Sequence, residues 1–417
     1  MVGVLNRAFA IACIALPSAA YAVDLAPGQE LTLGTDVGFQ HISALPSWID
    51  GSVGKLAGDS DGVVLCRAFV DYAGHLRDTL EVSIAAEAYT DGIGRSVDIT
   101  QAYLQWRPVP RTSNRIRLRL GAFYPPLSLE NREPGWSSPY TLNLSAINTW
   151  IAEELRTIGV EISLSRRPAK LGGAHEFSLV AAAFTGGDPA GSLLAWKGWS
   201  MHERQTRFGD ELPLATLPQL QPGGIFSKQD PYVTPFREID HRGGYYLGAG
   251  WRYRRRLELR AMHFENRAEP TAFVSGQYGW RTRFDQLATQ AQLPGEFGVI
   301  AQWMRGTTVM GPLIGAAHAV DTRFDSWFVL LTRDFETQRV TLRYDRFAVS
   351  DEDQVPLDNN TDDGDAWTLG YRYQLSSQVA VAVEWLSIES RHPAWAYYGF
   401  PQQYTENQLQ AMLRMRF

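Results

Sequence analysis

The sequence predicts an all-β protein: a transmembrane, antiparallel, up-and-down β-barrel of about 16 strands. Three observations lead to this prediction. Apolar and polar residues alternate with period two in segments of about ten residues. The connections between these segments are alternately short and long, and the chain ends in an amphipathic segment whose last residue is Phe417. After the first 22 residues no apolar run reaches about 18 residues, which argues against a helical membrane protein.

The first residues have the layout of a secretory signal. Arg7 precedes an apolar run from Ala8 to Leu16, and small residues follow up to Ala22,. Cleavage after Ala22 would divide the chain into a signal peptide, residues 1–22, and one barrel domain, residues 23–417. Only Cys66 would then remain, and a single cysteine cannot form an internal disulfide. We therefore expect an exported chain that is stabilised by hydrogen bonding and burial.

Alternation is clearest in residues 31–39, 80–87, 158–165, 367–374 and 379–385. In each segment the apolar side chains fall on one face, as expected for strands that have lipid on one side and a polar interior on the other.

The lengths of the connections support the same architecture. The predicted short connections are Gly74–Arg77, Pro108–Asn114, Arg166–Gly173, Arg254–Arg256, Leu293–Glu296, Phe335–Gln338 and Leu375–Gln378. The predicted long ones are Ala44–Asp61, Pro125–Glu154, Gly187–Arg242, Gly306–Val320, Val349–Asp365 and Glu389–Tyr404. One connection on the long side, Thr90–Ser96, is rather short. Tight turns at one end and long loops at the other are typical of outer-membrane barrels.

The segment "RIRLRLGAFY" assigns an inside and an outside to one strand. Arg115, Arg117 and Arg119 alternate with Ile116, Leu118 and Leu120. The opposite orientation would place three arginines in hydrocarbon, at about 2–4 kcal/mol each near the midplane. The arginines are therefore predicted to face the interior, which in a barrel of sixteen strands is wide enough for an aqueous channel.

The third long loop follows this strand and is predicted to contain a short helix. Ser145 is a suitable N-cap for a helix over Ala146–Leu155,. Glu153 and Glu154 lie late in that helix, where a negative charge opposes the helix dipole. Their position suggests that these carboxylates have another partner.

The chain resembles bacterial outer-membrane porins. The strand count, the inward arginine row, the long third loop and the phenylalanine-terminated strand carry this resemblance. The stretches "GAFYPPLSLENREPGWSSPYTLNLSAINTWIAEELRTIGVE" and "RYDRFAVSDEDQVPLDNNTDDGDAWTLGYRYQ" are similar to the phosphate-selective porin O and P superfamily. The resemblance implies a channel in the outer membrane of a Gram-negative bacterium, with a third loop folded into the lumen. Implied partners are small anionic or neutral hydrophilic solutes, outer-membrane lipid and the barrel-assembly machinery, and a homotrimer is one implied assembly.

The resemblance also implies roles for particular residues. The implied pore-lining anion path is Arg115, Arg117, Arg119, Arg372 and Arg414; the constriction loop contributes Glu130, Glu133, Glu153 and Glu154; and Phe417 is the assembly signal. Phosphate-selective members also use lysines in the constriction, whereas this chain has four lysines in total. A weak anion preference or a general pore is therefore expected in place of phosphate specificity. Whether the arginine row selects solutes or only balances lumenal carboxylates stays open.

Other functions find less support. A net charge of −6 argues against nucleic acid,. The chain lacks H-E-x-x-H and G-x-S-x-G motifs, so no enzyme activity, cofactor or metal site is expected. In "DNNTDDGD", Asp358, Asn360 and Asp362 fit the first three positions of a calcium loop, but Asp363 stands where glycine is needed,. A solvated loop is the favoured interpretation, and a divalent ion stays open. The alternative function is a surface barrel that acts as an adhesin or binding protein through the loop Gly187–Arg242.

Overall fold

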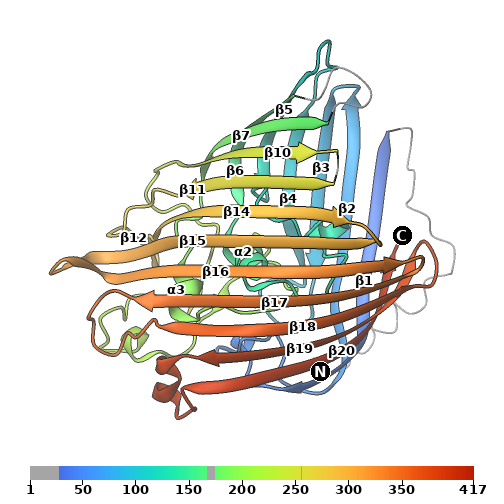
Figure 1. The fold of residues 1–417 in the computed structure, drawn as a ribbon. Helices are drawn as coiled ribbons and strands as arrows, with labels where there is room; N and C mark the ends of the chain where they lie inside the picture. Colours follow the sequence, from blue (N-terminus) through green and yellow to red (C-terminus); the bar gives the residue numbers. More distant parts are fainter. Residues whose placement is uncertain (1–27, 167–173, 255) are drawn as a thin grey trace.

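Sixteen antiparallel strands close into a single barrel (Figure 1), which confirms the predicted fold class. The computed structural model describes residues 28–166, 174–254 and 256–417. The predicted signal peptide lies outside the described residues, as does most of the predicted turn Arg166–Gly173. The barrel strands, in order around the wall, are β1 (Gln29–Ser43), β2 (Gly62–Arg77), β3 (Leu80–Ala88), β4 (Val97–Trp106), β5 (Asn114–Phe123), β6 (Thr157–Arg166), β7 (His175–Thr185), β10 (Gly244–Tyr253), β11 (Leu257–Glu265), β14 (Arg281–Leu293), β15 (Phe297–Ile314), β16 (Ala317–Phe335), β17 (Gln338–Asp351), β18 (Asp362–Gln374), β19 (Val379–Arg391) and β20 (Gln403–Arg416).

The two ends of the chain close the barrel. Strand β1 pairs with β20 as well as with β2, so no strand edge is left open,. Beyond β20, the terminal Phe417 exchanges two backbone hydrogen bonds with Leu33, at 2.7 and 2.8 Å. A closed sheet satisfies its backbone groups internally, which a bilayer requires of any spanning structure.

The predicted alternation holds along the strands. On β5, Ile116 and Leu120 face outward with 42% and 56% of their surface exposed, whereas Arg119 faces inward and is buried. On β20, Leu409 faces outward, and Gln410 and Arg414 face inward and are buried. On these two strands the outward face is therefore apolar, and the charged and polar side chains face inward.

Loop lengths follow the predicted parity with one correction. The predicted loop Gly306–Val320 is strand: β15 and β16 extend through it and leave only residues 315–316 as the turn. Gly311, with a φ of +82°, lies at a bulge in the ladder rather than in a turn,. The extension is stabilised because the inward side chain of Met310 packs in an apolar cluster with Leu193 and Trp196.

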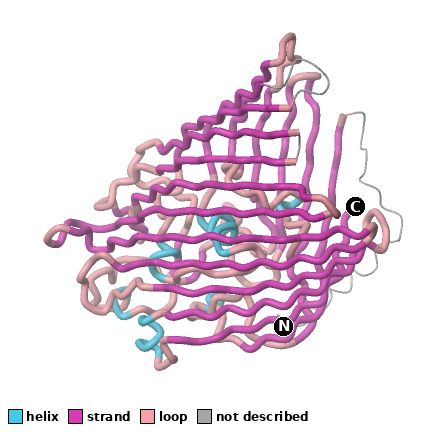
Figure 2. The backbone as a smooth tube through the Cα atoms, viewed as in Figure 1, coloured by secondary structure: helices cyan, strands magenta, loops and turns pink. Residues whose placement is uncertain are grey.

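Long loops fill the loop-side half of the barrel (Figure 2). Loop L1 (residues 44–61) contains the 3-10 helix η1 (Trp48–Asp50), and L3 (124–156) contains η2 (Pro134–Trp136) and α2 (Ala146–Glu154). L4 (186–243) contains α3 (Ser192–Trp196), η3 (Pro218–Leu220) and the small β8–β9 sheet (Leu212–Pro213, Tyr232–Val233). The connection after β11 contains the β12–β13 sheet (Phe273–Val274, Gln277–Tyr278), and the last loop contains η4 (Pro393–Tyr398). No helix among these described segments is long and apolar enough to span a bilayer.

Helix α2 confirms the helix predicted in the third loop, with Leu155 as its C-cap rather than its last residue. The Ser145 hydroxyl accepts a hydrogen bond from Asn148 N at 3.3 Å, as expected of an N-cap,. The indole of Trp150 then makes edge contacts with Phe284 and Phe324 on the inward face of the wall and with Trp199 of L4. The interior at this level is an apolar core, since many inward wall residues are themselves aromatic or aliphatic.

Candidate pore and the loops that fill it

The arginine row of β5 lies on the inward face beside β6. Arg119 forms a two-point contact with Glu161 of β6, from Nε at 2.9 Å and from Nη2 at 2.6 Å. Arg117 donates to the same carboxylate at 3.3 Å and to Ser163 at 3.1 Å. The Tyr246 hydroxyl of β10 also donates to Glu161, at 2.6 Å. Glu161 therefore gathers two arginines and one tyrosine, whereas Arg115 takes part in none of the ion pairs among the described residues.

A cavity of about 680 Å³ lies in front of this row, in the half of the barrel that has the short turns. Its charged lining consists of Arg107, Arg115, Arg117, Arg252, Arg260, Asp78, Glu176 and Glu258. A second space of about 340 Å³ is lined by Arg132, Arg252, Arg256, Glu258, Gln290 and Gln292. The two spaces share Arg252 and Glu258, so both belong to one polar region between β5 and β14.

Glu258 is the second carboxylate of this region. It accepts from Arg260 Nε at 2.6 Å and from Arg252 Nη2 at 3.1 Å. Arg132 of L3 lies 3.8 Å away. Three guanidinium groups thus surround one carboxylate, and the local charge is positive.

The other predicted arginines hold loop L3 against the opposite wall. Arg372 donates to Glu133 at 2.7 Å, and the buried Arg414 donates to the Ser138 carbonyl at 3.0 Å. Arg343, which is fully buried, donates to Glu130 at 2.7 Å and to the carbonyls of residues 143 and 144 at 2.9 and 3.1 Å. L3 is therefore tied to the β17–β20 wall by charge-assisted hydrogen bonds.

The four predicted constriction acids do not face the β5 row. Glu130 and Glu133 pair with wall arginines, as described above. Glu153 pairs with Lys197 of L4 and contacts His202 Nε2 at 2.7 Å. Burial alone would raise the pKa of Glu153, but Lys197 and His202 lower that pKa to about 2.

Glu154 serves as an anchor for helix α3. Its carboxylate accepts from Leu193 N at 3.1 Å and Leu194 N at 3.3 Å, and from its own helix through Trp150 Nε1 at 2.6 Å. Burial raises the pKa of Glu154 to about 7 in spite of these bonds. The late acidic pair of α2 thus has the partners that its position suggested, and they belong to L4.

L4 itself folds into the barrel. Its side chains Trp199, Met201, His202 and Arg207 are buried. Lys55 of L1 donates to Asp362 of β18 at 2.8 Å and to the Trp199 carbonyl at 2.9 Å, which joins L1, L4 and the wall. The loop that the adhesin alternative would use is therefore largely occupied inside the barrel.

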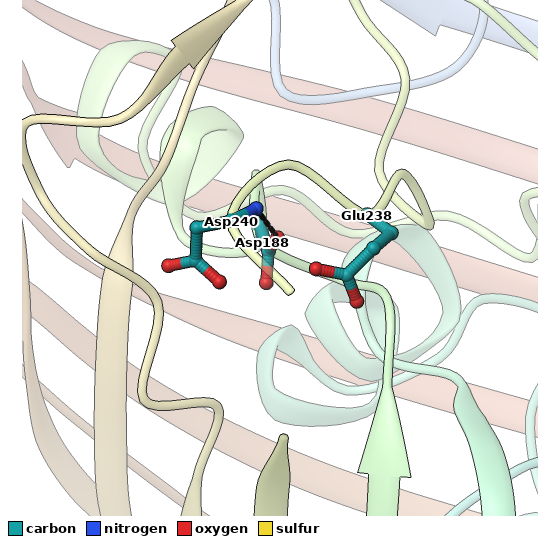
Figure 3. Close-up of side chains that lie close together, drawn as sticks. All are labelled: Asp188, Glu238 and Asp240. Carbon is teal, nitrogen blue, oxygen red and sulfur yellow. Dashed lines mark hydrogen bonds between the residues drawn. The ribbon is translucent and has the colours of Figure 1, made fainter. Parts of the chain in front are cut away.

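An acidic trio closes the base of L4. Asp188, Glu238 and Asp240 offer carboxylate oxygens that lie within 4.8 Å of one another (Figure 3). Asp188 accepts from Ile239 N at 2.5 Å and from Asp240 N at 3.2 Å, and Glu238 accepts from Gly186 N at 2.8 Å. Burial, followed by the nearby Glu238 and Asp240 carboxylates, raises the pKa of Asp188 to about 7. Backbone N–H groups thus satisfy the trio and fix the ends of the loop.

Sequence reasoning missed Glu161, Arg252, Glu258, Arg260 and Arg343. A usable signal exists for most of them. The segment "RYRRRLELR" alternates arginine and glutamate with apolar residues around a short turn, in the same way as the β5 row. Glu161 lies directly opposite Arg119 in the β5–β6 pairing. The partner of Arg343 has no such local signal because Glu130 is 213 residues away along the chain.

Comparison with known proteins shows the fold. No protein-family model and no curated protein sequence matches the chain. Among solved structures, the outer membrane channel DcaP of Acinetobacter baumannii matches with a TM-score of 0.51 and 13% identity, over 96% of this chain and 100% of that one. The anion-selective porin from Comamonas acidovorans matches with a TM-score of 0.50 and 12% identity, over 93% and 99%. OmpT from Vibrio cholerae, solved in a trimer form, matches with a TM-score of 0.50 and 9% identity, over 93% and 99%.

Proposed function

We propose that this protein is an outer-membrane channel for small hydrophilic solutes and that it prefers anions. The observation that carries the proposal is the arginine-lined cavity inside a barrel whose outer face is apolar. Channel and porin structures share the fold, which adds support at the level of architecture. Such a barrel isolates its interior from lipid, so the interior side chains set what can enter.

The charge of the cavity favours anions. Its lining includes five arginines and three carboxylates. A net positive field in a confined space with low-dielectric walls raises the local concentration of anions. Guanidinium groups also bind carboxylate and phosphate oxygens at two points, which suits transient binding along a wall.

The proposal covers anions in general rather than phosphate alone. Of the described lysines, Lys55 and Lys197 form buried ion pairs with Asp362 and Glu153. Neither lysine lines the cavity. Lysine is the compact cation that the phosphate-selective resemblance would require, whereas the described residues that line the cavity supply guanidinium groups and no lysine.

Planar-bilayer recording of the purified protein tests the channel. We expect discrete conductance steps and, in asymmetric KCl, a reversal potential that indicates anion preference. Arg117→Glu reverses one charge of the cavity wall, and the anion-to-cation permeability ratio should fall by at least about twofold.

Arg95→Glu is the matched control because Arg95 is exposed in the β3–β4 loop, away from the cavity. It carries the same change of charge and should leave the ratio unchanged. A folded barrel without conductance would contradict the channel, whereas equal ratios for Arg117→Glu and wild type would contradict the selective role of the row.

A further inference from the structure

The loop between β17 and β18, L7 (residues 352–361), meets L4 through a buried polar contact. Asp358 and Asn360 of L7 are 1% and 2% exposed, and Gln219 of L4 is 3% exposed. The sequence favours a solvated loop here, but these side chains are enclosed. Asp358 Oδ1 accepts hydrogen bonds from Gln219 Nε2 at 2.7 Å and from Asn360 Nδ2 at 2.9 Å.

Three buried oxygen atoms of this contact have no hydrogen-bond donor within the described chain. They are Asp358 Oδ2, Asn360 Oδ1 and Gln219 Oε1. Buried acceptors are normally paired, because an unpaired one loses its hydration without compensation. Three such atoms on side chains that contact one another therefore indicate a missing partner that carries positive charge or donates hydrogen bonds.

The electrostatic surroundings favour a cation. The charged groups that act on Asp358 are Asp353 and Asp351, both acidic. Asp351 is linked to the same contact because it accepts from Asn360 N at 3.4 Å. Among the ion pairs of the described residues, none neutralises Asp358. The contact thus combines unpaired oxygen atoms with three carboxyl groups that form no ion pair among the described residues.

The three unpaired oxygen atoms belong to side chains that meet at one carboxylate. The amide nitrogens of Gln219 and Asn360 lie 2.7 and 2.9 Å from Asp358 Oδ1. The unpaired oxygen of each amide is bonded to the same carbon as that nitrogen, so all three unpaired oxygens belong to one small cluster.

We propose that Asp358, Asn360 and Gln219 bind a calcium ion at the junction of L7 and L4. Carboxylate and amide oxygens are the ligands of hard divalent cations, and an irregular set from two loops suits calcium better than magnesium, which needs a near-ideal octahedron. The third ligand position of the linear calcium-loop pattern, Asp362, is not part of this site because it is paired with Lys55. The third ligand comes from Gln219, which is 139 residues away from Asp358.

This site differs from the acidic trio at the base of L4. The trio of Asp188, Glu238 and Asp240 accepts backbone hydrogen bonds, and none of its atoms is among the buried atoms without a partner. Substitutions in the two clusters should therefore affect calcium binding differently in the titration described next.

Calcium titration of the full-length, folded barrel tests the proposal. After treatment with a chelator and its removal, isothermal titration of the wild type with CaCl₂ should show one site per chain, and excess MgCl₂ should not abolish it. Asp358→Asn keeps the shape and removes the charge, and it should weaken binding by at least about tenfold. Gln219→Leu removes a ligand from the other loop and should also weaken binding.

Two variants serve as controls. Glu352→Gln neutralises an exposed carboxylate of the same loop and should bind calcium as wild type does. Asp188→Asn should also retain binding. No binding to wild type, wild-type affinity in both Asp358→Asn and Gln219→Leu, or loss of binding in Asp188→Asn would overturn the proposal. Heat-modifiable migration on gels checks that each variant is folded. Since the readout is binding rather than conductance, its outcome is independent of the channel proposal.

Discussion

Neighbouring residues of helix α2 face opposite chemical surroundings. Glu153 has Lys197 and His202 within contact and stays ionised, with a pKa of about 2. Glu154 has backbone N–H groups and an indole, and burial raises its pKa to about 7. The pKa values of these two adjacent carboxylates thus differ because successive side chains of a helix point in different directions and meet different neighbours.

This difference predicts a pH-dependent effect of Glu154→Gln. The native pKa lies above the ordinary value of 4.5, so the folded state binds more protons than the unfolded state between these pH values,. Stability is therefore lost as the pH rises from about 4.5 to about 7. The neutral variant avoids this loss and should be more stable than wild type at pH 8.5, by a difference on the order of 3 kcal/mol, and equally stable at about pH 4.

Thermal unfolding in detergent, followed by circular dichroism at both pH values, measures the effect. Glu153→Gln is the contrasting variant because it leaves Lys197 buried without its partner,. It should lower the unfolding temperature at both pH values. A Glu154→Gln profile parallel to wild type would contradict the raised pKa.

At the scale of elements, L4 decides how much of the interior is open. Its residues Trp199 and Met201 join the apolar core that includes α2 and the inward wall. L3 is fastened by arginines of the wall. L4 is fastened to L3 and L1, and also directly to the wall, where Trp199 donates to Asp362 at 2.9 Å and to the Ala348 carbonyl at 3.1 Å. L4 therefore fills the interior together with L3.

Removal of L4 should widen the conducting path. We expect a variant in which a short glycine–serine linker replaces Gly187–Arg242 to show severalfold higher single-channel conductance, because the interior then loses the side chains of L4 while L3 stays anchored by Arg343 and Arg372. Single-channel recording measures this. Unchanged conductance in the folded variant would mean that solutes bypass L4.

The terminal strand closes the barrel and provides a second prediction at this scale. Phe417 contributes two backbone hydrogen bonds to Leu33 through atoms that every residue has. Phe417→Ala keeps those atoms and removes only the ring. If the ring is the assembly signal, the folded fraction in the outer membrane of living cells should fall and Phe417→Tyr should restore it. Equal refolding of all three proteins in detergent would separate assembly from stability.

At the scale of the whole molecule, the barrel follows from patterns that are local in the chain. Alternation in each strand depends on the two faces of a pleated sheet, and turn parity depends on an up-and-down meander. The extension of β15 and β16 through the predicted loop Gly306–Val320 was missed because Gly306 and Gly311 are typical of turns. Packing of Met310 on L4 outweighs that local tendency.

The candidate site was only partly predictable. Alternation placed Arg115, Arg117 and Arg119 on the inward face, and it could have placed Arg252 and Glu258 there too. It could not show which arginine meets which acid. Arg372 and Arg414 are also inward, yet they lie at L3 rather than at the cavity, because the path of L3 across the interior decides which wall it covers.

The sequence by itself determined the β class, a count of about sixteen strands, the inside and outside of the clearly alternating strands, and the helix in the third loop, because all of these depend on neighbours within a few residues. Only the tertiary structure decided how the interior is divided. L3 and L4 lie against the β14–β20 wall, and the cavity lies against β5–β14. The tertiary structure also brought Gln219 to Asp358. Those contacts unite residues far apart in the chain, and closure of the barrel around its own loops brings them together.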